Sequence, residues 1–237
     1  MMDIFGRALL DFQRGEYTED IKTFSSLGDE DVIPLPYLFR SFKEMPEIEQ
    51  KALELSKGKV LDIGCGAGSH SLYLQGLGID VTGLDQSEAS LEVCRLRGLE
   101  SVVHSSILDF SGTKFDTLLL LMNGIGLCGT FEKLSGFLSH LKTLLLPGGQ
   151  ILMDSSDIIY MFDRDEDGGV WVPGTQIYYG EISFSMEYKG VQGEVFDWLY
   201  LDFNMLKECC NSLNLNCDLV ISGEHYDYLA KVSLKGE

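Results

Sequence analysis

The chain has 237 residues, 45% of them hydrophobic and 23% charged, which is typical of one large globular α/β domain. Its formal net charge of −19, with lysines and arginines scattered along the chain, argues against nucleic acid as a partner. The longest apolar run, Leu118 to Met122, is too short to cross a bilayer, so we expect no membrane partner. The six cysteines form no C-x-x-C pair and no signal-peptide pattern precedes them, which predicts a cytoplasmic protein with reduced thiols.

Residues 1–57 are expected to fold as an N-terminal helical cap rather than as a separate domain. The apolar spacing predicts an amphipathic helix over residues 4–12, followed by a polar acidic loop through Asp31. The prolines at 33–36 predict an extended segment, and Pro46 opens a second helix that ends directly before the first strand.

The first strand ends in a turn in which every second residue is glycine. An apolar run from Val60 leads into Asp62-Ile-Gly-Cys-Gly-Ala-Gly68, and helical spacing resumes at Ser69. Glycines in such a turn let backbone N–H groups approach a ligand, because no Cβ intervenes. A dinucleotide fingerprint would need glycine at position 69, and the Asp62 carboxylate would repel a pyrophosphate but attract an ammonium group. The turn therefore predicts a nucleotide-like ligand without a phosphate.

This D-x-G-x-G-x-G segment resembles the first motif of the class I S-adenosylmethionine (SAM)-dependent methyltransferases, where the acid lies near the methionine part of the cofactor. The resemblance covers residues 57–157 and, more weakly, the last 35 residues. It includes the segment 146–152, similar to the L-x-P-G-G-x-L that precedes the family's fifth strand. The resemblance implies SAM as the cofactor. It implies cofactor contacts at Asp62, Gly64, Cys65, Gly66 and Gly68.

Strands and helices alternate after the glycine turn, and this alternation predicts a doubly wound, mostly parallel seven-stranded sheet of the SAM methyltransferase fold. We expect a single domain in which residues 58–157 form the SAM-binding half. The further strands expected in this half are 79–84, 101–104, 115–121 and 150–154, and the helices between them are 87–97 and 130–146.

The pattern changes after residue 157. Residues 158–201 are predicted to form an inserted loop and β-hairpin, with strands at 176–188 and 191–200 and a turn at Lys189-Gly190. The apolar face of the first hairpin strand has to be covered by the sheet, by the cap or by a second subunit. Residues 202–237 are predicted to form a helix and two strands, which matches the antiparallel last strand of the family fold. Asp202 is the expected N-cap of this helix, as Ser87 is of the helix 87–97.

Two strand ends are expected to contact the adenosine part of the cofactor. Asp85 lies 21 residues after Gly64, a spacing at which a carboxylate at the next strand end reaches both ribose hydroxyls, and Gln86 follows it. The alternative for Asp85 is an acid favoured by a helix N-terminus. The resemblance places Ser106 where the family has an acid for the adenine amino group, with the N–H of Ile107 as a donor. Asp109 is the alternative acceptor, or merely begins a turn.

Met122 and Asn123 end the fourth strand and are the remaining candidate cofactor contacts. Asn123 can orient either the ammonium group of the cofactor or the acceptor, and the alternative is a glycine-rich loop without chemistry. The segment is not the Asp/Asn-Pro-Pro-Tyr/Phe found in many amino-group methylases of nucleic acids.

A roofed pocket for a small molecule is expected at the carboxyl ends of the strands. Asp154 and Asp157 at the end of the fifth strand, with Tyr37 and Arg40 from the cap, are the candidate acceptor-binding residues. Arg40 either pairs with the cofactor carboxylate or is an ordinary surface arginine. No side chain is identified as a general base.

No metal site is expected. The run 163–168 copies the first half of a calcium loop, but position 174, where a bidentate glutamate is required, is glycine. An acidic loop in solvent is the expected alternative, and residues 160–175 are expected to be mobile.

The sequence therefore predicts a SAM-dependent methyltransferase that transfers a methyl group to a small-molecule acceptor by in-line displacement. The alternatives are a non-catalytic SAM-binding or regulatory protein, since fold does not decide function, and an aminopropyl transferase on the same fold. The acceptor atom and the oligomeric state stay open.

Overall fold

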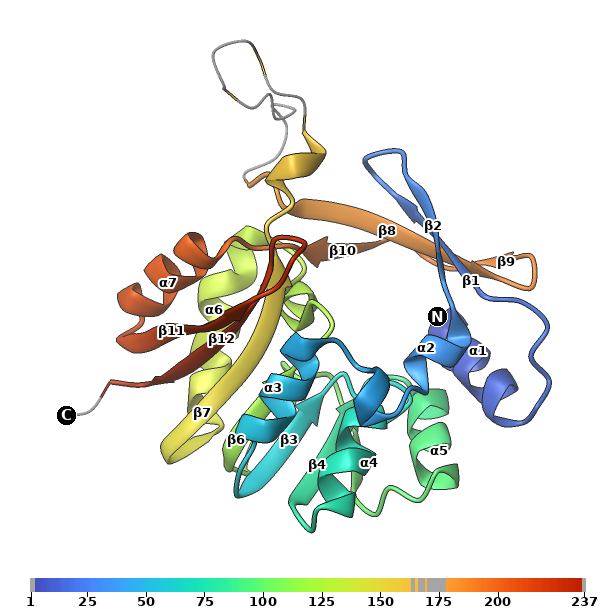
Figure 1. Ribbon diagram of the computed structural model, residues 1–237, viewed down its shortest axis with the longest axis horizontal. Coiled ribbons are helices and arrows are strands. Elements are labelled where there is room, and N and C mark those ends of the chain that lie inside the picture. Colours follow the sequence, from blue (N-terminus) through green and yellow to red (C-terminus); the bar gives the residue numbers. More distant parts are fainter. Residues whose placement is uncertain (1–2, 163–164, 166–168, 170–177, 236–237) are drawn as a thin grey trace.

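The computed structural model describes residues 3–162, 165, 169 and 178–235, and a seven-stranded sheet forms its centre (Figure 1). The strands of this sheet are β3 (Lys59–Ile63), β4 (Asp80–Asp85), β5 (Val102–His104), β6 (Phe115–Leu120), β7 (Leu145–Ser156), β11 (Leu215–Ser222) and β12 (Asp227–Leu234). In the order β11-β12-β7-β6-β3-β4-β5, neighbours pair in parallel except that β12 is antiparallel to both β7 and β11. The predicted doubly wound, mostly parallel seven-stranded sheet is confirmed.

Helices cover both faces of this sheet. One face packs against α3 (Glu47–Leu55), α4 (Ser69–Gly76) and α5 (Glu88–Leu96), and the other against α6 (Phe131–Thr143) and α7 (Phe203–Ser212). Leu118 and Leu120 of β6 belong to the core under α6 and α7, whereas Leu119 belongs to the core under α3 to α5. A strand buried on both faces needs such an uninterrupted apolar run. Ser87 and Asp202 cap α5 and α7 with their side chains, as predicted.

A second, antiparallel sheet joins two segments that are far apart in the sequence. Its strands are β1 (Ile21–Ser25), β2 (Glu30–Ile33), β8 (Glu181–Tyr188), β9 (Val191–Gln192) and β10 (Phe196–Leu199), in the order β10-β8-β1-β2 with β9 beside β8. Figure 1 shows this sheet arching above the carboxyl ends of the central strands and reaching α1 (Ile4–Gln13). We call it the roof sheet.

The roof sheet corrects the prediction of a polar acidic loop through Asp31. Residues 21–33 are mostly paired as β1 and β2, and β1 also pairs with β8, with Phe24 opposite Ser185. A two-stranded hairpin such as β1 and β2 is marginally stable by itself, and the pairing of β1 with the distant strand β8 extends it into a larger sheet. The extended segment predicted at 33–36 is also partly wrong, because α2 (Leu35–Leu38) begins within it. Proline is compatible with this first helical turn, where its missing N–H group would have no partner.

The predicted end of the helix 130–146 and the predicted start of the strand 150–154 are both wrong. The helix α6 ends at Thr143, and β7 begins at Leu145, which pairs with Phe115 of β6. The leucines at 144–146 are compatible with either element, so only the pairing with β6 decides between them. The remaining short turns are the 3₁₀ helices η1 (Phe42–Glu44), η2 (Gly124–Cys128) and η3 (Ile159–Met161).

The apolar face of β8 is covered by the chain itself at both of its ends. Ile182 packs with Ile158 and Phe162, which follow β7, whereas Tyr188 packs with residues of α1 that include Ile4. The predicted strand 191–200 is divided into β9 and β10. Most of the acidic loop at 163–168 and of the expected mobile stretch 160–175 lies outside the described residues. In the part of the chain that is described, no helix could cross a membrane.

Candidate active site

The glycine turn lies between the carboxyl ends of β3 and β4. Gly64, Gly66 and Gly68 have φ values of 74°, 53° and 79°, a left-handed conformation that other residues adopt at a cost. The N–H groups of Gly64 and Cys65 donate to the carbonyl of Leu84 at 2.8 and 3.1 Å, which joins the turn to β4. The turn is thereby held open at the edge of the sheet where ligands of such folds bind.

Asp85, at the end of β4, lies beside this turn. One carboxylate oxygen accepts from the N–H of Gly66 at 2.9 Å, and the other accepts from the N–H of Ser87 at 2.8 Å. Burial raises the pKa of Asp85, although both backbone donors favour its charged form. The next residue, Gln86, is exposed, and its carbonyl oxygen lies 2.9 Å from the Nε2 of His104.

Asp62 lies beneath the turn and is 2% exposed. Its carboxylate accepts from the hydroxyl of Ser71 at 2.6 Å. Burial raises the pKa of Asp62, and the neighbouring His70 and Ser71 oppose this rise. Asp62 is thus a buried hydrogen-bond acceptor, and this suits a role in orienting either the glycine turn or a bound ammonium group.

The N-terminal cap closes over the glycine turn. The ring of Phe5 lies 3.6 Å from the position that a Cβ on Gly66 would occupy. Asp3, which caps α1, accepts from the hydroxyl of Ser87 beside Asp85. Arg97 of the α5 C-terminus donates to the carbonyl of Ala67 at 2.6 Å and so holds the turn from the other side.

The loop after β5 lies next to Asp85, because the N–H of Ser105 donates to the Asp85 carbonyl at 3.1 Å. Ser106 begins a turn: its carbonyl accepts from the N–H of Asp109 at 3.1 Å, and its hydroxyl accepts from the N–H of Leu108 at 3.3 Å. Ile107 is buried in the core, and Asp109 is exposed. Both Ser106 and Asp109 remain candidate adenine contacts.

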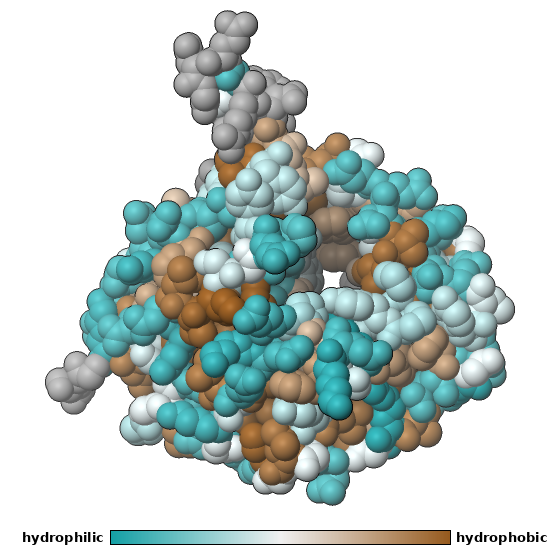
Figure 2. Space-filling view, viewed as in Figure 1, coloured by the Kyte–Doolittle hydropathy of each residue, from teal (hydrophilic) through white to brown (hydrophobic). Residues whose placement is uncertain are grey.

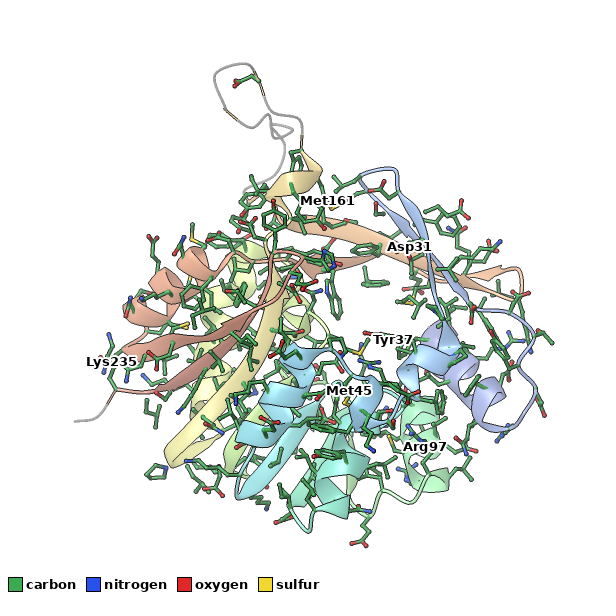
Figure 3. All side chains as sticks on the ribbon, viewed as in Figure 1. Asp31, Tyr37, Met45, Arg97, Met161 and Lys235 are labelled. Atoms are coloured by element: carbon green, nitrogen blue, oxygen red, sulfur yellow. The ribbon has the colours of Figure 1, made fainter. Side chains whose placement is uncertain are left out.

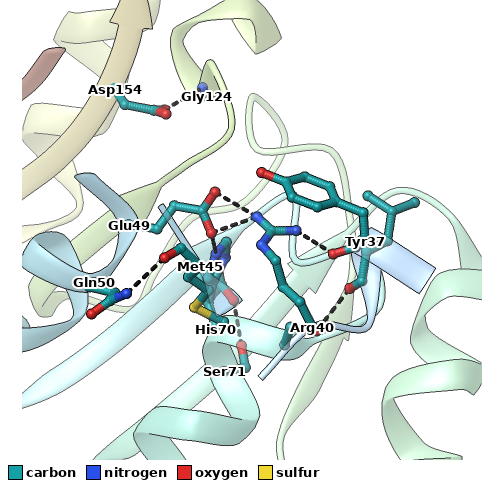
Figure 4. A network of polar contacts seen from close by, with 12 residues as sticks. Tyr37, Arg40, Met45, Glu49, Gln50, His70, Ser71, Gly124 and Asp154 are labelled. Atoms are coloured by element: carbon teal, nitrogen blue, oxygen red, sulfur yellow. Dashed lines mark hydrogen bonds and ion pairs between the residues drawn. The ribbon is translucent and has the colours of Figure 1, made fainter. Parts of the chain in front are cut away.

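A buried ionic network connects the cap to the first helix after the turn (Figure 4). Arg40 contacts both carboxylate oxygens of Glu49 at 2.5 Å, and the Nε2 of His70 lies 2.9 Å from the same carboxylate. Burial raises the pKa of Glu49, but the hydrogen bonds from His70 and Arg40 outweigh it and lower that pKa. The Arg40 guanidinium also lies 3.8 Å from the centre of the Tyr37 ring. Arg40 is therefore not the surface arginine that was one of the two predicted alternatives.

A cavity of about 260 Å³ lies between this network and the ends of β6 and β7. Figure 2 shows the molecule hollowed below the roof sheet, and Figure 3 shows Tyr37 at the edge of this space. The roof sheet contacts η2 where the ring of Trp198, in β10, lies over Gly126. A Cβ on Gly126 would be only 2.0 Å from this ring. The cavity is lined by Tyr37, Pro46, Ile48, Glu49, Met122, Asn123, Asp154, Ser156 and Asp227.

Two adjacent strands direct acidic residues to one wall of the cavity. Asp154 and Ser156 share a face of β7 because side chains alternate along a strand, and Asp227 of β12 pairs with Ser156. An oxygen of Asp154 accepts from the N–H of Gly124 at 3.1 Å. Burial raises the pKa of Asp154 to about 6, although the backbone N–H groups of Gly124 and Asn123 favour the charged form.

Met122 and Asn123 adopt the left-handed conformation, with φ values of 64° and 56°. Two successive non-glycine residues in this region are unusual, and such strain is concentrated at functional sites. The side-chain oxygen Oδ1 of Asn123 is buried without a hydrogen-bond partner in the described residues. The same holds for the Nε of Arg40.

The structure brings together most of the predicted acceptor-binding residues but not all of them. Tyr37 and Asp154 line the cavity, and Arg40 lies behind Glu49. Asp157 is directed elsewhere, since its carboxylate accepts from the hydroxyl of Tyr179 at 2.7 Å and is not part of the cavity lining.

Sequence reasoning missed Glu49, Ser156 and Asp227 as residues of the cavity. Glu49 looks like any acid in the first turn of a helix, where acids are common. Asp227 could have been found, because it begins the strand expected to lie antiparallel to the one that carries Asp154. The contact of His70, in α4, with Glu49 joins it to the edge of the cavity.

The matching family model and the curated relatives each cover part of the chain. Residues 61–153 match the family described as "Methyltransferase domain". The chain is 48% identical over 56 residues to a ubiquinone biosynthesis O-methyltransferase of Bordetella avium, and 47% identical over 57 residues to that of Pasteurella multocida. The first of these matches covers 24% of this chain and only 23% of the Bordetella protein.

Solved structures extend the likeness to nearly the whole chain. A SAM-dependent methyltransferase from Bacteroides fragilis, solved in complex with S-adenosylhomocysteine, is 42% identical, with a TM-score of 0.90 over 98% of this chain and 94% of that one. The CcbJ methyltransferase from Streptomyces caelestis is 16% identical, with a TM-score of 0.62 over 81% of this chain and 91% of that one, and shares the fold alone.

Proposed function

Because the chain belongs to the class I SAM-dependent methyltransferases, we propose that it transfers the methyl group of SAM to a small-molecule acceptor bound under the roof sheet. When bound, SAM would supply an electrophilic methyl group on a positively charged sulfur, which the acceptor would attack in line with S-adenosylhomocysteine as the leaving group. The residues of this chain have to hold both molecules in line and exclude water, which lowers the barrier without further covalent chemistry.

The residues beside the glycine turn suit SAM. The position of Asp85 at the end of β4, beside the glycine turn, supports a role in binding the ribose hydroxyls, and the positive-φ glycines leave room for close approach of the backbone. The Nε of Arg40 is a buried donor that lacks a partner, and the carboxylate of a methionine moiety is the kind of group that would satisfy it. Decarboxylated SAM has no such group, so this atom favours methyl transfer over aminopropyl transfer.

The cavity is the observation that supports a small-molecule acceptor. It is about 260 Å³ in volume, lies below the roof sheet, and has carboxylates from Glu49, Asp154 and Asp227 in its lining. A phosphate backbone would be repelled both by these groups and by the net charge of −19. A duplex also needs an open, basic surface, whereas here the roof sheet contacts η2 through Trp198.

Calorimetry tests the cofactor part of this proposal. SAM and S-adenosylhomocysteine are expected to bind the wild-type protein, and decarboxylated SAM is expected to bind more weakly. Asp85→Ala is expected to weaken SAM binding by about 10- to 100-fold, the scale of a lost charge-assisted hydrogen-bond pair. An unchanged dissociation constant would remove Asp85 from the site.

A labelling experiment tests the acceptor part. The protein is incubated with methyl-labelled SAM and, separately, with a fraction of small metabolites, duplex DNA, RNA and unfolded protein. Label is expected in the small-molecule fraction alone. Label in a nucleic acid or a protein would refute a small-molecule acceptor, and SAM binding without any transfer would favour a regulatory SAM-binding protein.

A further inference from the structure

We propose that the methyl acceptor is an amine, whose protonated nitrogen binds in the cavity between the carboxylate of Asp154 and the side-chain oxygen of Asn123. This inference rests on the proposed methyl transfer and specifies its substrate class. It is carried by three features of the cavity: the balance of donors and acceptors in its lining, the lack of a cation beside Asp154, and the unpartnered oxygen of Asn123.

The cavity lining is rich in hydrogen-bond acceptors and carries no basic side chain. Of its nine residues, Glu49, Asp154 and Asp227 are acids, and none is lysine, arginine or histidine. Carboxylates accept hydrogen bonds and cannot donate them when ionised. A ligand that binds here therefore has to bring donors, and an ammonium group is a compact ligand group that has donors and no acceptor.

Among the described residues, Asp154 and Asp227 are the carboxylates of this cavity without an ion pair, and Asp154 is the one bonded to the backbone of η2. The charge of Glu49 is offset by Arg40 at 2.5 Å and by the nearby His70. Among the described residues, in contrast, no lysine, arginine or histidine nitrogen lies within 4.0 Å of the Asp154 carboxylate, which interacts instead with the backbone N–H groups of Gly124 and Asn123. A charge placed in such surroundings is normally paired, so the missing cation is a feature that a ligand can supply.

Asn123 provides a second acceptor from the adjacent strand end. Its Oδ1 is buried without a partner, although buried polar atoms nearly always have one. The residue lines the same cavity as Asp154, and the left-handed backbone at φ 56° holds its side chain at the start of η2. An ammonium group has three N–H donors, enough to satisfy Asn123 and Asp154 together.

Other acceptor classes fit this lining less well. A carboxylate or phosphate acceptor would face like charges, which disfavour it strongly at short range. A hydroxyl has one donor and cannot satisfy both oxygens. A neutral heterocycle would leave the Asp154 charge without a counter-ion.

The transfer step balances for an amine. The bound ammonium first releases one proton, to the Asp154 carboxylate and from there to solvent, which frees the nitrogen lone pair. The lone pair then forms the N–CH₃ bond while the bond between the methyl carbon and sulfur breaks. The electron pair of that bond stays on sulfur, so the positive charge of the sulfonium passes to the methylated nitrogen. Asp154 thus faces a cation both before and after transfer.

The test uses three probes that share one ring: benzylamine, benzyl alcohol and benzoate. Their binding to the full chain is measured by calorimetry, both without cofactor and with saturating S-adenosylhomocysteine. The wild type is expected to bind benzylamine at least about tenfold more tightly than either of the other two probes. Asp154→Asn is expected to weaken benzylamine binding at least about tenfold and to change S-adenosylhomocysteine binding by less than about twofold.

Asp218→Asn is the matched control, since it removes one negative charge from an exposed position of β11 that does not line the cavity. This variant is expected to leave the dissociation constants of all three probes and of S-adenosylhomocysteine unchanged. The inference is overturned if benzylamine does not bind, if the alcohol or benzoate binds equally well, or if Asp154→Asn does not weaken benzylamine. Failure of S-adenosylhomocysteine to bind would instead refute the proposed function, because the probe comparison is also made without it.

Discussion

Asp154→Asn is expected to stabilise the protein near neutral pH while it weakens acceptor binding. The carboxyl group is held between strand ends with its pKa raised from the ordinary 3.8 to about 6, and burial is the main cause. Asparagine has nearly the same shape, retains an oxygen that can accept from the Gly124 N–H, and cannot ionise. The substitution therefore removes a buried charge without creating a cavity.

The expected magnitude follows from the difference between the two pKa values. Below about pH 3 the carboxyl is protonated in both the folded and the unfolded state, so its ionisation does not affect stability. As the pH rises from the ordinary pKa of 3.8 through the folded-state pKa of about 6, the folded protein loses stability, because the unfolded chain ionises more readily. Above about pH 7 the loss approaches about 3 kcal/mol in the wild type and is absent from the variant.

Urea denaturation of both proteins between about pH 3 and pH 8 measures this difference, because the titration of all other groups is common to the two. The advantage of the variant in unfolding free energy is expected to grow from near zero to about 2–3 kcal/mol. Asp218→Asn, at an exposed position, is expected to change stability by less than about 0.5 kcal/mol at every pH. A difference between Asp154→Asn and wild type that is independent of pH would refute the reasoning.

Three further substitutions test other parts of the structure. Glu49→Gln leaves Arg40 buried without its carboxylate and is expected to cost about 3–5 kcal/mol in urea denaturation; a loss below about 1 kcal/mol would mean that the pair is not buried in solution. Gly126→Ala places a Cβ 2.0 Å from the Trp198 ring, and is expected to lower the melting temperature and to recover part of the loss when combined with Trp198→Leu. Ser106→Asp is expected to be tolerated and to tighten SAM binding measured by calorimetry; weaker binding would argue against Ser106 as the adenine contact.

The central sheet and the cofactor turn could be predicted because their signals are local. The apolar run into Gly64, Gly66 and Gly68 reports a strand, a tight turn and a helix within about ten residues, and the resemblance rests on the same segment. Ser87 and Asp202 were recognisable as caps, since a helix N-terminus leaves N–H groups that a side-chain oxygen satisfies. Boundaries were less accurate, as at Leu145, where an apolar run is compatible with both a helix and a strand.

Only the tertiary structure determined which residues surround the cavity below the roof sheet. The sheet that residues 21–33 join is completed only by a distant segment, because β1 and β2 pair with each other and β1 also pairs with β8, where Lys22 lies opposite Glu187 across 165 positions of the chain. The same holds for the buried contact of Arg40 with Glu49, and for the meeting of Asp154 with Asn123 at one cavity. The sequence states the charge of each residue and the period of each apolar pattern. Whether a charged residue has a counter-charge depends on which distant segment packs against it. The glycine turn and the cofactor class therefore followed from the sequence, whereas the acidic, roofed cavity followed from the pairing of the N-terminal cap with the inserted hairpin.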